Sequence, residues 1–303
     1  MHPTPIIEDT FAEAFPMVAT RLIITAADHE LARTAAQEFS GHASSVIGCD
    51  AEAGIERELP PDQTPDMRPG VAALVFAFSR DKLERAVAGR VAQNVLTCPT
   101  TACYSGLPVD SSQDRIKVGA QIRFFGDGFQ ISKWIGGRRY WRIPVMDGEF
   151  VCEATAGTVQ GVGGGNLLIC GRDQASALAA ARSAVAAIRR VPDCVLPFPG
   201  GIVRSGSKVG SKYAALPAST NDAWCPTLRG QTTTALQEGE ECVYEIVIDG
   251  LSQSAVAAAM LAGLQAAQNS PGVLRISAGN YGGKLGKYHF FLHQLQNHIE
   301  EPS

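Results

Sequence analysis

An internal repeat is the feature of this sequence that most limits how the chain can fold. The segment Leu22–Asp28 recurs in pattern as Leu167–Asp173, and a stretch with the apolar spacing of a helix follows each copy. Asp28 and Asp173 occupy the position where a side-chain oxygen caps a helix. The chain has 303 residues, so we expect two related lobes, residues 1–147 and residues 148–303.

Each copy is expected to continue into a second strand after its helix. In the first copy, Gly41 ends the helix before a predicted strand at residues 44–48. In the second copy, Pro192 ends the helix before a strand that begins at Cys194. Another strand and helix follow in each half, with strands predicted at Val71–Phe78 and Val243–Ile248.

Antiparallel hairpins are expected between the two copies. Residues 121–134 and 133–144 alternate around Gly126-Asp127-Gly128 and Gly136-Gly137, which is typical of hairpins. Two strand–helix–strand units in each half, joined by antiparallel pairing, indicate the α+β class. We therefore predict two related lobes of ferredoxin-like split βαβ type, with additional antiparallel hairpins.

Composition and charge exclude several classes of protein. The formal net charge of −4 does not favour nucleic acid as a partner. The eight cysteines include no Cys-x-x-Cys pair, so neither a disulfide framework nor a zinc knuckle is expected. The longest apolar run, Val71–Phe78, is too short to span a bilayer, and Glu8, Asp9 and Glu13 lie where a signal peptide would be basic and then apolar. We expect a soluble, cytoplasmic protein with no membrane partner.

Three motifs resemble known sites but lack the required context. The glycines of residues 161–165 precede a predicted strand, whereas a dinucleotide fingerprint follows one. In residues 201–208, Ser207 separates the second glycine from the lysine of a P-loop pattern. His289, His293 and His298 would share a face if their segment were helical, but no carboxylate accompanies them. We therefore expect no metal site.

One loop, Phe198–Lys212, has the composition of an anion-binding site. It contains four glycines and three hydroxyl side chains together with Arg204, Lys208 and Lys212. Glycines let backbone amides approach a ligand closely, and the cations can bind carboxylates or phosphates. The alternative is a solvated surface loop.

The carboxyl group of Glu245 is the most informative single side chain. Strand alternation places it on the same face as Val243 and Val247. If that face is buried, desolvation raises the pKa of Glu245 toward neutrality, as a proton donor or acceptor requires at cellular pH. The alternatives are an exposed strand face and an edge strand protected by charge.

Several long segments together identify a family resemblance. They are Asp9–Phe15, Glu52–Ile55, Phe124–Gly128, Pro197–Tyr213, Ala218–Ala223, Cys225–Arg229 and Ser277–Gly286. They resemble formylmethanofuran:tetrahydromethanopterin formyltransferases, including the formyltransferase component of the bacterial formyltransferase/hydrolase complex. The similarity extends from about Ile6 to about Leu295.

The resemblance implies an activity and a set of functional residues. Family members work without a prosthetic group and move a formyl group between the amine of methanofuran and N5 of tetrahydromethanopterin, or analogues of these substrates. It implies that Glu245 transfers protons and that Asn221 or glycine-rich backbone amides stabilise the oxyanion. The residues expected to bind substrate are Arg204, Ser205, Lys208, Ser211, Lys212, Asn280 and Lys284.

The resemblance also implies partners and leaves two alternative functions open. Family members form homotetramers, and the bacterial relatives join other subunits in a complex that helps to oxidise formaldehyde. One alternative is a structural subunit without activity, and the other is a folate-dependent formyltransferase. A transfer assay with tetrahydromethanopterin and with tetrahydrofolate would distinguish them.

Overall fold

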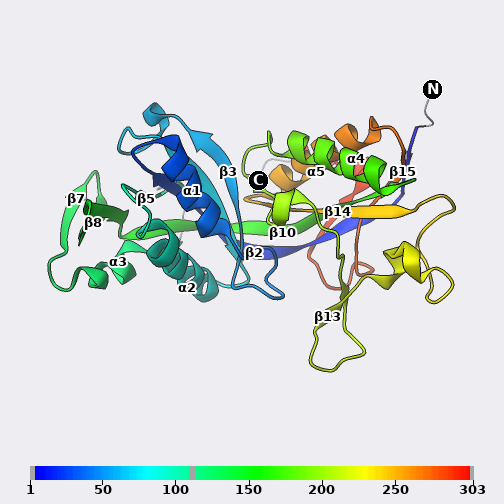
Figure 1. Ribbon diagram of the computed structural model, residues 1–303, viewed down its shortest axis with the longest axis horizontal. Helices are drawn as coiled ribbons and strands as arrows, with labels where there is room; N and C mark the ends of the chain where they lie inside the picture. The colour runs from blue at the N-terminus through cyan, green and yellow to red at the C-terminus, as the bar shows by residue number, and fades with distance from the viewer. Residues whose placement is uncertain (1–3, 109–113, 301–303) are drawn as a thin grey trace. The chain divides into compact units, whose positions relative to one another are not determined.

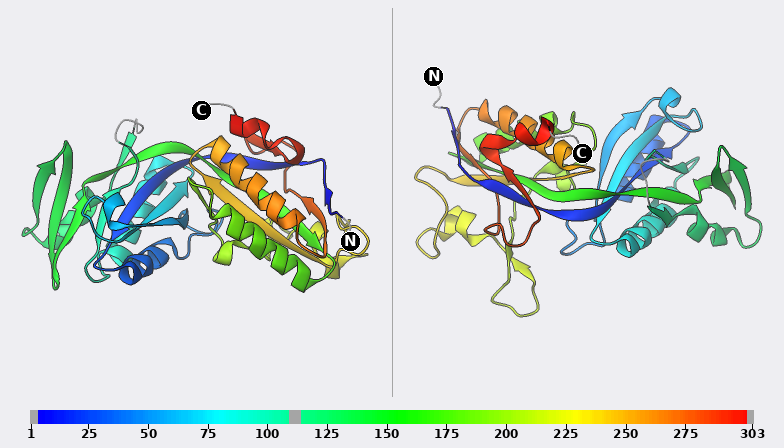
Figure 2. Two further views of the ribbon diagram at one scale, coloured as in Figure 1. Left: turned by 90° about the horizontal axis from the view of Figure 1, so that it is seen from above. Right: turned by 180° about the vertical axis from the view of Figure 1, so that it is seen from behind.

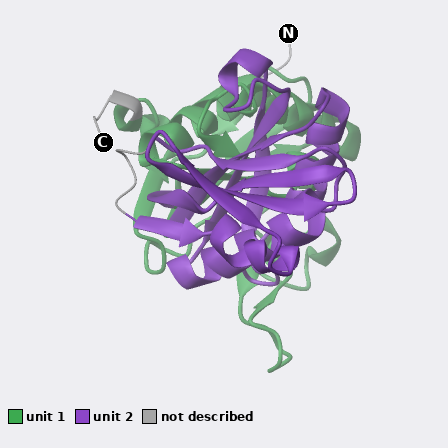
Figure 3. Ribbon diagram, turned by 90° about the vertical axis from the view of Figure 1, so that its left-hand side faces the viewer, with its two compact units in different colours: residues 1–16, 162–303 green, residues 17–161 purple. Residues whose placement is uncertain are grey.

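The two compact units of the protein do not follow the order of the chain. The computed structural model describes residues 4–108 and 114–300. Unit 1 comprises Met1–Pro16 and Val162–Ser303, and unit 2 comprises Met17–Gly161 (Figure 3). The chain passes between them in its two longest strands, β2 (Phe11–Thr25) and β10 (Thr155–Gly171). The predicted lobes, residues 1–147 and 148–303, are the two repeated halves of the sequence, and this division stays a prediction.

Unit 1 contains a four-stranded antiparallel arrangement with two helices on one face. Its strands are β10, β11 (Cys194–Val195), β14 (Cys242–Gly250) and β15 (Val273–Ser277). They are ordered β15–β10–β14–β11 in space. Helices α4 (Gln174–Ile188) and α5 (Gln253–Gln268) pack side by side against this sheet (Figures 1 and 2). At its margins, β1 (Ile6–Ile7) pairs with β15, and β16 (Tyr288–Phe291) pairs with the start of β2.

Unit 2 repeats this topology. Its strands are β2, β3 (Glu52–Leu59), β4 (Gly70–Ala77) and β5 (Ala102–Ser105), and its helices are α1 (His29–Ser40) and α2 (Arg80–Arg90). The spatial order β5–β2–β4–β3 matches that of unit 1. In both units the fourth strand lies beside the first, which confirms the predicted ferredoxin-like split βαβ topology.

Unit 2 also contains the predicted antiparallel additions. Strands β7 (Ile131–Ile135), β8 (Arg138–Val145) and β9 (Gly148–Glu153) form successive hairpins, and β9 pairs with β5. The turn between β7 and β8 lies at Gly136-Gly137, as expected. Two further elements, β6 (Asp114–Lys117) and α3 (Gly119–Ile122), precede these hairpins.

Local sequence explains where the four main helices begin. Asp28, Ser79, Asp173 and Ser252 each accept a hydrogen bond from a backbone amide three residues later. The apolar sides of α4 and α5 then pack on Leu167, Ile169, Ile246 and Ile248 of the sheet. Because side chains alternate along a strand, Leu168 and Glu245 lie on the face of the sheet without helices.

Three local predictions were wrong, and one arrangement that was considered only as a condition does not occur. Residues 44–48 form turns, and the second strand of unit 2 is β3. Residues 119–126 are helical because Gly119 and Ile122 are buried at helical rather than strand spacing. The glycines at 161–165 lie inside β10, where the pairing register shifts between Val162 and Gly165. His289 lies in β16, so the three histidines do not share one helix.

Neither a membrane-spanning helix nor a cluster of metal ligands occurs among the described residues. None of the helices there is both long enough and apolar enough to cross a bilayer. In the same part of the chain, no three histidine, cysteine, aspartate or glutamate side chains are grouped as metal ligands.

Candidate active site

A pocket opens in unit 1 on the face of the sheet that has no helices. It is lined by Leu168, Val203, Arg204, Ser205, Gly206, Asn221, Trp224, Cys225, Val243 and Glu245. Four of the predicted site residues, Glu245, Asn221, Arg204 and Ser205, therefore meet at one place. Leu168 and Glu245 are paired across β10 and β14, so the regular sheet forms the inner wall.

The carboxyl group of Glu245 lies on a rigid strand in partly buried surroundings. The amide of Glu245 donates to the Val203 carbonyl at 3.0 Å, and the amide of Val203 donates to the Glu245 carbonyl at 2.8 Å. Burial raises the pKa of Glu245 from its ordinary value of 4.5 to about 7. A carboxyl group with such a pKa can both accept and donate a proton near pH 7.

The loop Phe198–Lys212, part of which lines the pocket, needs glycine at two positions. Gly201 has a φ of 81°, and a Cβ there would lie 2.8 Å from Leu196 Cδ1. Gly206 has a φ of 56°, and a Cβ there would lie 3.2 Å from Asn221 Cβ. Side chains other than glycine are strained in this backbone region. Close packing of this loop against Asn221 therefore explains part of its high glycine content.

Asn221, Trp224 and Cys225 enter the pocket from a tightly turned segment. Trp224 N donates to the Asn221 carbonyl at 3.0 Å, and Cys225 Sγ lies 3.4 Å from the same oxygen. All three residues are half-buried. Trp224 and Cys225 were not predicted as site residues, although both lie in or beside segments that carry the family resemblance.

Three predicted substrate-binding residues lie outside the pocket lining, on or near a hairpin of unit 1. Strands β12 (Lys208–Val209) and β13 (Ala218–Ser219) form this hairpin, which projects from the sheet (Figure 1). Lys208 forms an ion pair with Asp222, and its hydrogen bond holds the pKa of that carboxyl below the usual range. Ser211 accepts a hydrogen bond from the Tyr213 amide, and Lys212 is exposed. Arg204 is therefore the cation of this loop that lines the pocket.

The other two predicted substrate-binding residues belong to a glycine-rich loop that Glu13 organises. The buried Glu13 carboxylate accepts hydrogen bonds from the amides of Tyr281, Gly283, Leu285 and Gly286. Burial alone would raise the pKa of Glu13, but these donors outweigh it and the pKa is lowered. Asn280 donates to Thr10 and to the Phe11 carbonyl, and Lys284 is exposed. Four amides of this loop therefore serve an internal anion and are not free for an oxyanion.

The Tyr281 side chain of this loop lies outside the pocket lining but within electrostatic range of Glu245. Its phenol pKa is raised, first by burial and then by the negative charges of Glu245 and Glu13. Its ring also packs against Phe15, with ring centroids 6.1 Å apart. Glu13 and Tyr281 were not predicted, because the hydrogen-bond partners of Glu13 lie more than 260 residues away along the chain.

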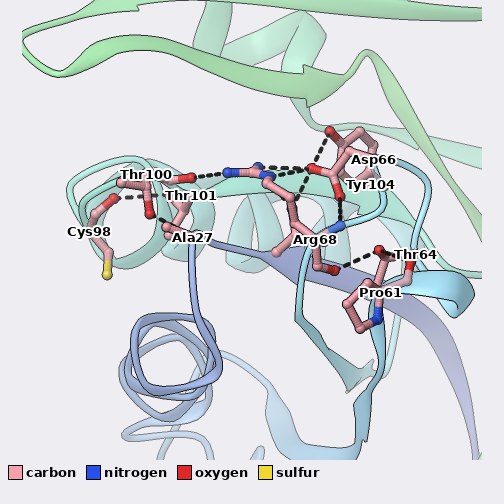
Figure 4. A network of polar contacts seen from close by, with 10 residues as sticks. Ala27, Pro61, Thr64, Asp66, Arg68, Cys98, Thr100, Thr101 and Tyr104 are labelled. Carbon is pink, nitrogen blue, oxygen red and sulfur yellow. Dashed lines mark hydrogen bonds and ion pairs between the residues drawn. The ribbon is translucent and has the colours of Figure 1, made fainter.

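The repeat lets the same position be compared in unit 2. Ile23 corresponds to Leu168 in the repeat and pairs with Ala72 on β4, so a buried methyl group replaces the Glu245 carboxyl. Nearby, Asp66 accepts hydrogen bonds from Arg68 and Tyr104 (Figure 4). It also accepts one from Thr25. The described part of unit 2 therefore has a closed polar network on this side of its sheet, and at the strand position of Glu245 it has no acid.

Comparison with protein-family models gives matches along most of the chain. Residues 4–145 match the model described as formylmethanofuran-tetrahydromethanopterin formyltransferase. Residues 148–295 match a model described as the proximal lobe of the same family. These two models together include every residue of the pocket lining.

Three relatives of known name are similar over nearly their whole length. The formylmethanofuran–tetrahydromethanopterin formyltransferase of Methylococcus capsulatus is 58% identical, covering 95% of this chain and 97% of that protein. The formyltransferase/hydrolase complex of Methylorubrum extorquens, solved with methylofuran, contains a chain that is 50% identical with a TM-score of 0.92; the match covers 98% of this chain and 97% of that one. The Methanosarcina barkeri formyltransferase structure is 47% identical with a TM-score of 0.90, covering 96% of this chain and 98% of that one.

Proposed function

This chain belongs to the formylmethanofuran–tetrahydromethanopterin formyltransferase family, and we propose that it transfers a formyl group between methanofuran, or a bacterial analogue, and N5 of tetrahydromethanopterin or its dephospho form. The observation that supports this most directly is the pocket whose lining includes Asn221, Arg204 and Glu245, the last with a pKa raised to about 7. Both substrates are bound and released in each turnover, and no prosthetic group takes part.

Proton transfer is the chemical task assigned to Glu245. In the direction toward the pterin, N5 attacks the formamide carbon, and a C–N bond forms as the carbonyl becomes a tetrahedral oxyanion. Glu245 accepts the proton from the attacking nitrogen and then donates it to the leaving amine as the second C–N bond breaks. The same group serves the reverse direction. General acid–base catalysis of this kind contributes about 10²- to 10⁴-fold.

The negative charge of the tetrahedral intermediate needs hydrogen-bond donors. The side-chain amide of Asn221 lines the same pocket as Glu245 and is the proposed donor. Backbone amides of residues 281, 283, 285 and 286 are less suitable, because the Glu13 carboxylate already accepts their hydrogen bonds.

Substrate binding divides between the pocket and its surroundings. Arg204 and Ser205 line the pocket, and we assign them contacts with a polar or anionic part of a substrate there. Lys208, Ser211, Lys212, Asn280 and Lys284 lie outside the lining and would contact only the outer parts of a long substrate. Of these, Lys208 has the weakest case because it already forms an ion pair with Asp222.

Assembly and location form a second part of the proposal. The Methylorubrum extorquens structure contains its formyltransferase chain within a formyltransferase/hydrolase complex, so we propose that this chain associates with further subunits. The family resemblance supports a homotetramer, a cytoplasmic location and a role in formaldehyde oxidation. Light scattering of the purified chain, alone and with candidate subunits, measures the number of subunits in each assembly directly.

The test of function is a formyl-transfer assay on the purified chain with Glu245→Gln. We expect kcat to fall at least 100-fold, because the amide cannot exchange the proton. In the wild-type protein, kcat/KM toward the pterin should rise with pH through about 7, and the variant should lack this rise. Glu238→Gln is the matched control, because Glu238 is exposed and lies outside the pocket lining.

Three results would contradict parts of the proposal. A folded Glu245→Gln variant with wild-type rate would remove the carboxyl from the mechanism. A wild-type chain that is inactive both alone and with candidate subunits would favour a structural subunit. Activity with tetrahydrofolate and none with tetrahydromethanopterin would overturn the choice of acceptor.

A further inference from the structure

A buried ion pair lies behind one wall of the pocket. Arg275 on β15 is 3% exposed and Glu240 is 1% exposed at the side chain. Arg275 Nε and Nη2 donate to the two carboxylate oxygens of Glu240, each at 2.8 Å. Arg275 Nη1 donates to Glu8 Oε2 at 2.6 Å, and Nη2 also donates to the Ala235 carbonyl at 2.9 Å. The guanidinium is thus bound on several sides.

Burying two charges is costly, and a buried ion pair is often no more stabilising than apolar side chains of the same size. A contribution to global stability alone is therefore a weak explanation for this pair. Its geometry suggests a different role, since a bidentate guanidinium–carboxylate pair fixes both the distance and the orientation of the two segments that it joins.

The segment fixed by the pair leads directly to the pocket. Glu240 accepts a hydrogen bond from the Gln237 amide at 2.9 Å. The Ala235 amide donates to the Ala223 carbonyl at 2.8 Å, next to Trp224 in the chain. The guanidinium carbon of Arg275 also lies 5.1 Å from the centroid of the Trp224 ring, within the range of a cation–π contact. Trp224 lines the pocket together with Glu245.

We propose that Arg275 and Glu240 are positioning residues that fix the Trp224 indole as one wall of the pocket and thereby determine how tightly a substrate binds beside Glu245. This inference rests on the proposed function. The pair acts through Trp224, so its loss weakens binding more than it slows the chemical step. The opposite sheet wall, formed by Leu168 and Glu245, keeps its geometry because β10 and β14 position it.

The test combines kinetics with the fluorescence of one tryptophan. The chain has three tryptophans, so a Trp134→Phe, Trp141→Phe background leaves Trp224 as the reporter. In this background, Glu240→Gln should raise KM for at least one substrate fivefold or more, with kcat within threefold. Acrylamide quenching of Trp224 should increase about twofold. Glu241→Gln is the control, because Glu241 is adjacent but exposed and pairs with Arg229 instead.

A second variant keeps the test decisive if Glu240→Gln does not fold. Glu8 is the more exposed partner of Arg275, with a side chain that is 39% exposed. Glu8→Gln removes the charge of this partner. It should raise KM and acrylamide quenching as Glu240→Gln does, but by a smaller factor. Unchanged KM values and unchanged quenching in a folded variant would overturn the inference. An inactive wild-type protein would instead overturn the proposed function, while the quenching comparison would still test the positioning of Trp224.

Discussion

Replacing Glu245 by glutamine should make the protein more stable at alkaline pH while it removes activity. When folding raises the pKa of a carboxyl group, the folded state is more stable with that group protonated than with it ionised. Its contribution to stability is therefore greatest below its ordinary pKa of 4.5 and is lost as the pH rises through about 7. Glutamine mimics the protonated form at every pH, so the variant should not show this loss.

The magnitude follows from the two pKa values of Glu245. One pKa unit corresponds to about 1.4 kcal/mol, so the interval from 4.5 to about 7 gives an upper bound of about 3.5 kcal/mol at pH 8. Because the side chain retains some exposure to the pocket, we expect Glu245→Gln to gain ~1–3 kcal/mol at pH 8. At pH 5 the gain should be below ~1 kcal/mol.

Urea unfolding of both proteins between pH 5 and pH 8 measures this difference. The free energy of unfolding of the variant, minus that of the wild type, should increase steadily over this interval and level off near pH 8 and above. Glu238→Gln should give a difference that does not change with pH, because Glu238 is exposed. A flat difference for Glu245→Gln, or a variant that is less stable at pH 8, would refute the burial argument.

Two further predictions concern Glu13 and Asp66, two acids outside the pocket lining. Glu13→Gln should cost about 2–4 kcal/mol of stability, because its NH2 group cannot accept the hydrogen bonds of two backbone amides and its remaining oxygen carries no charge; hydrogen exchange of the Tyr281 and Gly283 amides should accelerate at least tenfold, and unchanged exchange would count against the assignment. Asp66→Asn should lower the pKa of Tyr104, which burial and then the Asp66 charge raise; alkaline difference absorbance measures it, and an unshifted titration would contradict the contact.

Much of the fold could be predicted because the repeat and the helix caps are local features. Asp28 and Asp173 cap equivalent helices, and the sequence around each is enough to indicate strand then helix. Strand β3 was missed because Glu56, Arg57 and Glu58 interrupt its apolar pattern. The structure explains why a charged side chain is tolerated at Glu56, since its carboxylate is buried and forms an ion pair with Arg21.

The candidate site was predicted in part from alternation along a strand and in part from the composition and family resemblance of the loop that carries Arg204 and Ser205. The period of two indicated that Glu245 and Val243 share a face, and both line the pocket. Composition alone could not show that Lys208 is paired with Asp222 or that Lys212 lies on the exposed hairpin. Trp224 and Glu13 depend on contacts between distant segments, which a single sequence does not reveal.

The duplicated architecture has one further consequence, which concerns how its two copies diverged. At the same strand position, one copy bears an ionisable group and the other bears the side chain of Ala72. The duplicated scaffold therefore carries a carboxyl group at this strand position in one copy alone. At Ala72 no desolvation of a carboxyl opposes folding, so this position can be packed for stability, whereas its sibling keeps an ionisable group there.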